Sequence, residues 1–149
     1  MVSTTARRVP LHTAAQVNLR IRQETEDRLA YFADHLQEIE GRLNELDREW
    51  DIERTIEANA STLAFTGVVL GVSLDRRWLA LPAVVTAFLF QHAVQGWCPP
   101  VPVLRRMGFR TSDEINQERY ALKALRGDFQ LLQKAQNKEL AVLQAVGLR

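Results

Sequence analysis

The sequence predicts an all-α protein: a two-helix transmembrane hairpin flanked by an N-terminal coiled-coil helix and a C-terminal amphipathic helix. Three observations lead to this fold class. Between Ala58 and Leu104 the only charged residues are three consecutive ones, at positions 75–77. A heptad pattern of apolar residues precedes this gap in the charges, and a broad apolar stripe follows it. Polar flanks of this kind belong in water, whereas a stretch without charge favours lipid.

The N-terminal flank is expected to contain two parts. Residues 1–12 are polar and include Pro10, which predicts a disordered tail. Residues 13–56 are predicted to form one helix, because apolar residues recur there at alternating spacings of three and four, as in a coiled coil. The alternative is a single amphipathic helix that packs against the rest of the chain. The expected seam consists of Leu29, Phe32, Leu36, Ile39, Leu43, Leu46 and Trp50.

The hairpin is expected over residues 57–108, with spans at about 58–74 and 78–97. A helix needs about 20 mostly apolar residues to cross a hydrocarbon layer roughly 30 Å thick. Trp78 and Trp97 stand at the two ends of the second span, where their rings favour the headgroup level. Three prolines after Trp97 are expected to end that helix. A soluble bundle could also bury such a hairpin, but the flanks supply little apolar surface to enclose it.

The distribution of arginines predicts the orientation of the hairpin. Six arginines lie on the outer flanks and two lie in the turn, which favours both termini on the cytoplasmic side. The flanking residues are Arg42, Arg48, Arg54, Arg105, Arg106 and Arg110, and those of the turn are Arg76 and Arg77.

Small residues in the first span predict a helix-packing face. Gly67 and Gly71 form a GxxxG pattern that Ala64 extends backward on a similar face. Missing side chains let two helix backbones approach closely. The partner is either the second span of the same chain or another copy.

Polar residues near the end of the second span form a candidate site. Gln91 and Gln95 lie one turn apart, His92 lies beside them, and Cys98 follows. Polar groups in hydrocarbon face a helix partner or a watery cavity. They therefore serve hydrogen bonding between helices, or they line a passage for a small solute in an oligomer. Cys98 itself is either a small residue at the membrane exit or a reactive thiol.

The C-terminal flank is predicted to form an amphipathic helix over residues 111–147. Thr111 and Glu114 have the spacing of a capping box, in which a hydroxyl and a carboxylate satisfy the first backbone N–H groups. Gln136 and Glu139 interrupt the heptad register, so a packing helix is favoured over a second zipper. Its stripe comprises Ile115, Leu122, Leu125, Phe129, Leu132, Leu140, Leu143 and Val146.

Composition excludes several functions. A single cysteine excludes an internal disulfide and a zinc site with several thiolates. The net charge of +1 gives no electrostatic case for nucleic acid. No catalytic constellation, phosphate loop or metal-ligand cluster is evident, so no enzymatic activity, cofactor or metal is expected.

The run from Gln95 to Gly108 contains Gly96, Cys98 and Pro99, and it resembles the YgaP-like inner-membrane transmembrane domain family. In that family a two-span hairpin ends in a Gly-x-Cys-Pro signature. The resemblance covers roughly residues 50–108 and implies a small bacterial inner-membrane protein that dimerises through the hairpin. The family's namesake also carries a rhodanese sulfurtransferase domain. This chain has helices in its place, so sulfur transfer is not implied.

These observations together predict a non-enzymatic, multi-pass protein of the bacterial inner membrane. It is expected to dimerise within the lipid bilayer and to present a cytoplasmic helical stalk that recruits an unidentified protein partner. The alternatives are an oligomeric passage for a small anion or sulfur species, and a membrane thiol sensor that uses Cys98. The sequence names neither the partner nor a solute.

Overall fold

The computed structural model describes residues 4–130, which form helices joined by short connections and contain no strand. These residues divide into two compact units. The hairpin unit comprises residues 4–22 and 50–115, and the three-helix unit comprises residues 23–49 and 116–130. The all-α prediction is therefore confirmed for the described residues.

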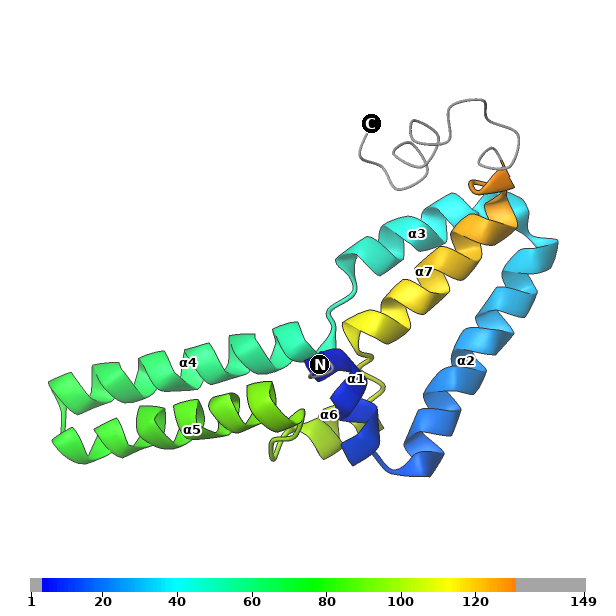
Figure 1. Cartoon of the computed structure of the whole chain (residues 1–149). Coiled ribbons are helices and arrows are strands. Elements are labelled where there is room, and N and C mark those ends of the chain that lie inside the picture. Colours follow the sequence, from blue (N-terminus) through cyan, green and yellow to red (C-terminus); the bar gives the residue numbers. More distant parts are fainter. Residues whose placement is uncertain (1–3, 131–149) are drawn as a thin grey trace, which may run out of the picture. The chain divides into compact units, whose positions relative to one another are not determined.

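The hairpin unit is built around two long antiparallel helices, α4 (Ile52–Ser73) and α5 (Ala80–Gln95). They lie side by side and are joined through a single 3₁₀ turn, η3 (Arg76–Leu79) (Figure 1). The Asp51 carboxylate accepts a hydrogen bond from the backbone N–H of Arg54 at 2.7 Å and so caps the start of α4. Pro82 lies in the first turn of α5, where a missing N–H costs little.

Helix α5 ends at Gly96 rather than at the prolines. Gly96 has φ 76°, in the left-handed region, and its N–H bonds to the carbonyl of His92 at 2.7 Å. Glycine is the usual residue at this position because it has no Cβ to strain. The prolines then open a further short helix, α6 (Val101–Arg106), which the sequence did not predict.

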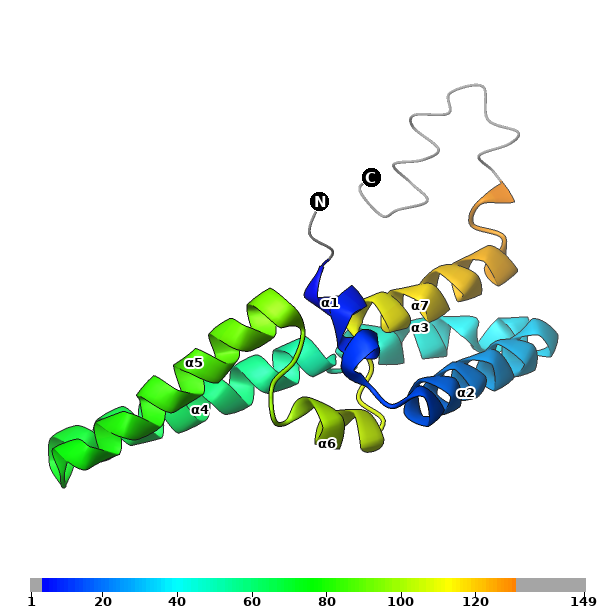
Figure 2. The same cartoon turned by 60° about the horizontal axis from the view of Figure 1, so that its bottom comes forward.

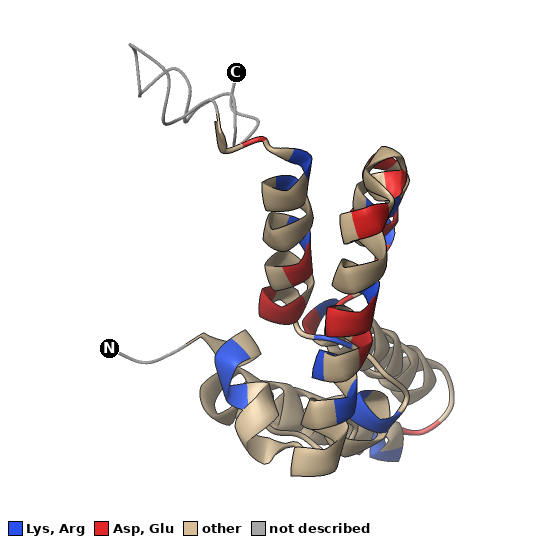
Figure 3. Cartoon of the chain, turned by 90° about the vertical axis from the view of Figure 1, so that its right-hand side faces the viewer, with Lys and Arg blue, Asp and Glu red and all other residues tan. Residues whose placement is uncertain are grey.

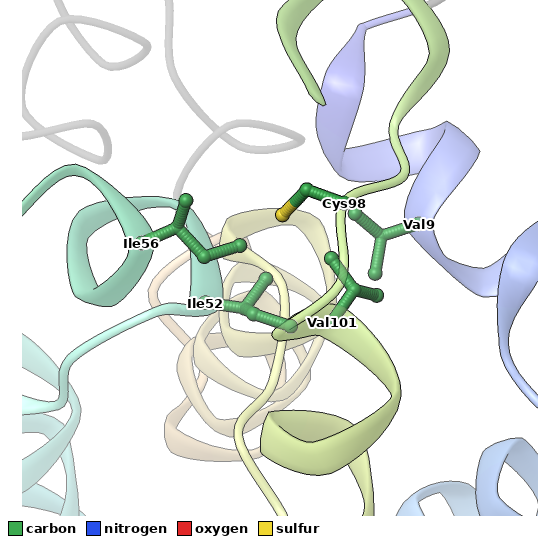
Figure 4. Close-up of a cluster of buried hydrophobic side chains, with 5 residues drawn as sticks. All are labelled: Val9, Ile52, Ile56, Cys98 and Val101. Atoms are coloured by element: carbon green, nitrogen blue, oxygen red, sulfur yellow. The ribbon is translucent and has the colours of Figure 1, made fainter. Parts of the chain in front are cut away.

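The N-terminal residues are ordered, so the predicted disordered tail is wrong for residues 4–12. They form α1 (Thr5–Arg8) and the 3₁₀ helix η1 (Val9–His12). The side chain of Val9 is fully buried, and Figure 2 shows α1 near the end of α5. The hydrophobic cluster that orders this segment contains Val9, Ile52, Ile56, Cys98 and Val101 (Figure 4).

The single helix predicted for residues 13–56 is also wrong, because the chain breaks twice. Helix α2 (Ala15–Asp34) ends before His35, whose ring stacks on Tyr31 with a centroid distance of 4.0 Å. The 3₁₀ helix η2 (Leu36–Glu38) and helix α3 (Ile39–Arg48) follow. Glu49 is then extended, with ψ 131°, so that α3 and α4 are separate helices.

Helix α7 (Ser112–Arg126) begins with the predicted capping box. The Glu114 carboxylate accepts from the backbone N–H of Thr111 at 2.8 Å, and the Thr111 hydroxyl accepts from that of Glu114 at 3.3 Å. The helix stops at Gly127, which has φ 89°. A continuous helix over 111–147 is therefore wrong, and residues 131–149, with their part of the stripe, lie outside the described region.

The three-helix unit contains α3 together with parts of α2 and α7. Ile39, Leu43 and Leu46 of α3 are buried within the chain. Glu118 on α7 is fully buried and accepts hydrogen bonds from Arg28 at 3.1 Å and from Arg42 at 2.8 Å. These contacts favour the alternative in which the amphipathic helix packs within its own chain.

Candidate membrane-anchoring site

Two helical stretches are long and apolar enough to cross a membrane, Leu36–Ser73 and Arg76–Gln95. In the most apolar 18 residues of each stretch, only 28% and 6% respectively are buried within the chain. A core helix of a soluble bundle would be mostly covered by its own chain, whereas these side chains face outward. The large apolar residues that are exposed on α4 and α5 are Leu63, Phe65, Val68, Val69, Val72, Val84, Phe88, Phe90 and Val94.

The inner side of the hairpin contains the two glycines of the GxxxG pattern, which are buried. A Cβ added at Gly67 would overlap the ring of Pro82, and one added at Gly71 would lie 2.6 Å from a methyl group of Leu79. Ala64 is half-buried on the same helix. The two glycines therefore let the helices of one chain approach, and their face is occupied by the hairpin's own second half.

The open end of the hairpin is closed by α1. The Arg8 guanidinium donates hydrogen bonds to the carbonyl oxygens of Ala93, at 3.0 Å, and of Val94. These carbonyls belong to the last turn of α5 and have no partner within the helix. The negative end of the helix dipole, at the C-terminus of α5, also stabilises a positive side chain there. Arg8 therefore acts as a C-terminal cap supplied by a segment far away in sequence.

Cys98 lies in the hydrophobic cluster between α5 and α6, with only 2% of its surface exposed. Burial raises the pKa of the Cys98 thiol, and the backbone N–H of Val101 opposes this only in part. A reactive thiol needs access and a lowered pKa. Burial and the raised pKa therefore favour the first of the two alternatives for Cys98, in which it is a small packed residue.

Of the polar residues near the end of α5, Gln91 and Gln95 bond to each other, whereas His92 has no partner in the described region. The Gln91 amide donates to the Gln95 carbonyl at 3.3 Å. His92 is 5% exposed, and neither of its ring nitrogens has a hydrogen-bond partner among residues 4–130. No hydrogen bond between α4 and α5 involves these three side chains in the described region, so the interhelical bonding considered for them is not observed.

A buried ion pair joins α6 to the start of α7. The Arg105 side chain is fully buried and donates to the two Glu114 oxygens at 2.6 and 2.8 Å. It also donates to the Asn18 side chain at 2.9 Å and to the Phe109 carbonyl at 3.1 Å. Burial alone would raise the pKa of Glu114, but the bonds from Arg105 and Thr111 outweigh it and lower that pKa.

Sequence reasoning missed this ion pair, since it counted Arg105 only among the charges that set orientation. A basic residue shortly before a capping box is the one signal that could have found it. The glutamate of such a box already faces the helix start, so a nearby guanidinium can bond the same carboxylate.

The residues of the expected coiled-coil seam do not form one stripe. Leu29 and Phe32 are half-buried on α2, while Leu36 and Trp50 lie at the two breaks and are about half exposed. Only the α3 part of the seam is buried. Its members are Ile39, Leu43 and Leu46.

Comparisons with known proteins give no relative. No family model, curated protein or solved structure matches the chain. Within residues 4–130 no group of three or more His, Cys, Asp or Glu side chains could hold a metal ion.

Proposed function

We propose that this chain is a membrane-anchored scaffold: α4 and α5 insert into the lipid bilayer as a hairpin, and the three-helix unit remains in water. One observation carries the proposal. Two consecutive helices expose large apolar side chains, including Phe65 and Phe90, each with 71% of its surface accessible. Burial of each such side chain stabilises a protein by about 1.5–3 kcal/mol, and this free energy is not gained while the side chain is exposed to water.

The structure of the hairpin suits insertion. The apolar parts of α4 and α5 satisfy their backbone hydrogen bonds within each helix, as the bilayer core requires. Thr62 and Thr66 bond to carbonyl oxygens of their own helix at 2.8 Å, which reduces the cost of placing hydroxyls in lipid. The glycine face gives the close packing that holds two helices together where no water drives their association.

The proposed location is the bacterial inner membrane, with both termini on the cytoplasmic side. The excess of flanking arginines supports the orientation. The resemblance to the YgaP-like family supports the location, and its signature residues have structural roles in this chain. Gly96 ends α5, Cys98 fills the cluster behind it, and Gly108 has φ 95° after α6.

The three-helix unit is proposed to recruit a cytoplasmic protein rather than to catalyse a reaction. This unit exposes the aromatic side chains of Tyr31 and Tyr120, and aromatic residues are enriched at protein interfaces. The proposed homodimer would use the outer, lipid-facing sides of α4 and α5, because the Gly67–Gly71 face already packs within the chain.

One observation favours a second function, a passage for a small anion in an oligomer. The buried ring of His92 has no hydrogen-bond partner in the described part of the chain, and a solute or water could supply one. His92→Leu should then abolish anion flux in proteoliposomes and leave assembly intact. Unchanged flux would dismiss the passage.

Alkaline carbonate extraction of membranes from cells that express the full chain tests the anchor. The protein should remain in the pellet. A double variant, Val84→Arg with Phe88→Arg, should move it to the supernatant, because each charge at the centre of a span costs about 2.5–3.5 kcal/mol. Gln37→Arg with Asn44→Arg adds the same charge to exposed positions of the three-helix unit and should change nothing. Release of the wild-type chain would contradict the proposal.

A further inference from the structure

The two units differ in how their cations are neutralised. In the three-helix unit arginines pair with carboxylates: Arg28 and Arg42 with Glu118, Arg119 with Asp47 at 2.9 Å, and Arg126 with Asp128 at 2.7 Å. Most carboxylates are on this unit, as the red positions of Figure 3 show. Four of the six cations described in this unit are therefore matched inside the protein, and Arg48 and Lys123 are not.

Five exposed arginines of the hairpin unit lack such partners among the described residues, and two of them, Arg54 and Arg106, lie at the base of the hairpin. Neither Arg54 nor Arg106 has an ion pair with a carboxylate among the residues that the structure describes. The Arg54 guanidinium lies over the Trp50 ring, 4.4 Å from its centroid. Arg54 stands in the first turn of α4 and Trp50 just before that helix, so the pair precedes the apolar stretch. Trp and Arg side chains at such a position are typical of the membrane interface.

Helix α6 has its apolar side chains on both faces. Val101 and Arg105 point into the hairpin unit and are fully buried. Val103 and Met107 remain 57% and 69% exposed, and they share the outer face with Arg106, since positions three and four apart lie together. In the adjoining N-terminal segment Leu11 is 77% exposed. An outer face that combines apolar side chains with arginine is typical of helices that lie in the headgroup layer.

From these contacts we infer that the base of the hairpin binds anionic phospholipid: Arg54 and Arg106 contact the headgroup phosphate, and Val103 and Met107 contact the upper acyl chains. This inference rests on the proposed membrane anchor. The two arginines need not share one pocket, because headgroups surround a hairpin on every side. The surface is continuous with the apolar helices α4 and α5, which place it at the depth of the phosphates.

Native mass spectrometry of the detergent-purified full chain tests this inference, with equimolar phosphatidylglycerol and phosphatidylcholine of identical acyl chains as probes. The ratio of bound lipids should favour phosphatidylglycerol by about fivefold for each arginine, which equals about 1 kcal/mol. Arg54→Gln with Arg106→Gln should bring the ratio close to one. Lys123→Gln with Arg126→Gln removes the same charge from the three-helix unit and should leave the ratio unchanged.

Arg54→Lys with Arg106→Lys keeps both charges and should retain the preference, which separates lost binding from lost folding. Free glycerol 3-phosphate should not displace the lipid, because it lacks the chains that Val103 and Met107 contact. Equal binding of the two lipids, or a preference that survives the glutamine variant, would overturn the inference. Carbonate extraction of the same proteins distinguishes the two claims: retention in the pellet without lipid preference removes only the inference, and release removes the anchor as well.

Discussion

At the base of the hairpin, Gly96 and Arg8 lie in direct contact. A Cβ on Gly96 would approach the Cβ of Arg8 to 2.5 Å and the backbone carbonyl carbon of Arg8 to 3.1 Å. Gly96 also has φ 76°, a conformation that other residues adopt only with strain. Gly96 thus ends α5 and lets α1 pack against that end. Both roles require a residue without a side chain.

Gly96→Ala should lower the stability of the hairpin unit by more than the left-handed strain of about 1–2 kcal/mol, because the added methyl group also displaces α1. Gly108→Ala is the matched control, with φ 95° and open space around its Cβ, and it should show the strain alone. Thermal unfolding of the two variants in detergent measures the difference. Equal losses would show that α1 does not pack against Gly96.

Arg8→Ala should destabilise the last turn of α5, because two carbonyl oxygens lose a charged donor worth about 1.5–3 kcal/mol together. Hydrogen exchange of residues 92–96 should accelerate. Arg7→Ala removes an exposed ion pair with Asp113 instead and should cost at most about 1 kcal/mol. The capping role fails if the two variants exchange alike.

Gly67→Ala should loosen the pairing of α4 with α5 by about 1–3 kcal/mol, since the new methyl group meets the Pro82 ring and Leu81. Titration with a denaturing detergent, followed by circular dichroism, measures this change. Ser61→Ala alters an exposed position on the same helix and should have little effect. A neutral Gly67→Ala would mean that the glycine face is not the packed face.

The hairpin unit should lose stability in mild acid. The pKa of Glu114 in the folded chain lies below its usual 4.5, so its ionised form stabilises the fold above that pH. This contribution should disappear as the pH falls from 4.5 through the lowered value. Glu114→Gln should abolish this part of the pH dependence and cost about 3–5 kcal/mol at neutral pH, because Arg105 is left buried without a counter-charge. A pH profile unchanged by the substitution would contradict the role of the pair.

Cys98 should react slowly with an alkylating reagent at neutral pH, because it is buried and its pKa is raised. Reaction should become fast once denaturant opens the cluster. Mass spectrometry of the native and denatured chain after alkylation measures both rates. Rapid alkylation of the native protein would restore the thiol-sensor hypothesis.

The sequence predicted the elements that follow from periodicity and charge. The charge gap located the two apolar helices, and the Thr111–Glu114 spacing located the start of α7. Such patterns are local and repeat over several turns, so they identify an element without knowledge of its neighbours.

The sequence did not predict features that depend on distant residues. The order of residues 4–12 depends on Val9 entering a cluster with Ile52 and Val101. The chain breaks at His35, between two helices, although the spacing of apolar residues continues through this position and does not predict a break. Arg105 belongs by sequence to the flanking charges that predict orientation, and its burial depends on Glu114 and Asn18, which bond to its guanidinium.

Labelling of single cysteines in intact membranes tests the insertion of the hairpin most directly. In a Cys98→Ala background, a water-soluble maleimide should label Arg77→Cys at the turn and leave Phe88→Cys unlabelled until detergent is added. Phe88 is exposed on the surface of the single chain, so either lipid or a second hairpin packed within the bilayer must protect it. Equal labelling of both positions in intact membranes would show that α5 lies in water, and the account of this chain as a membrane-anchored protein would be wrong.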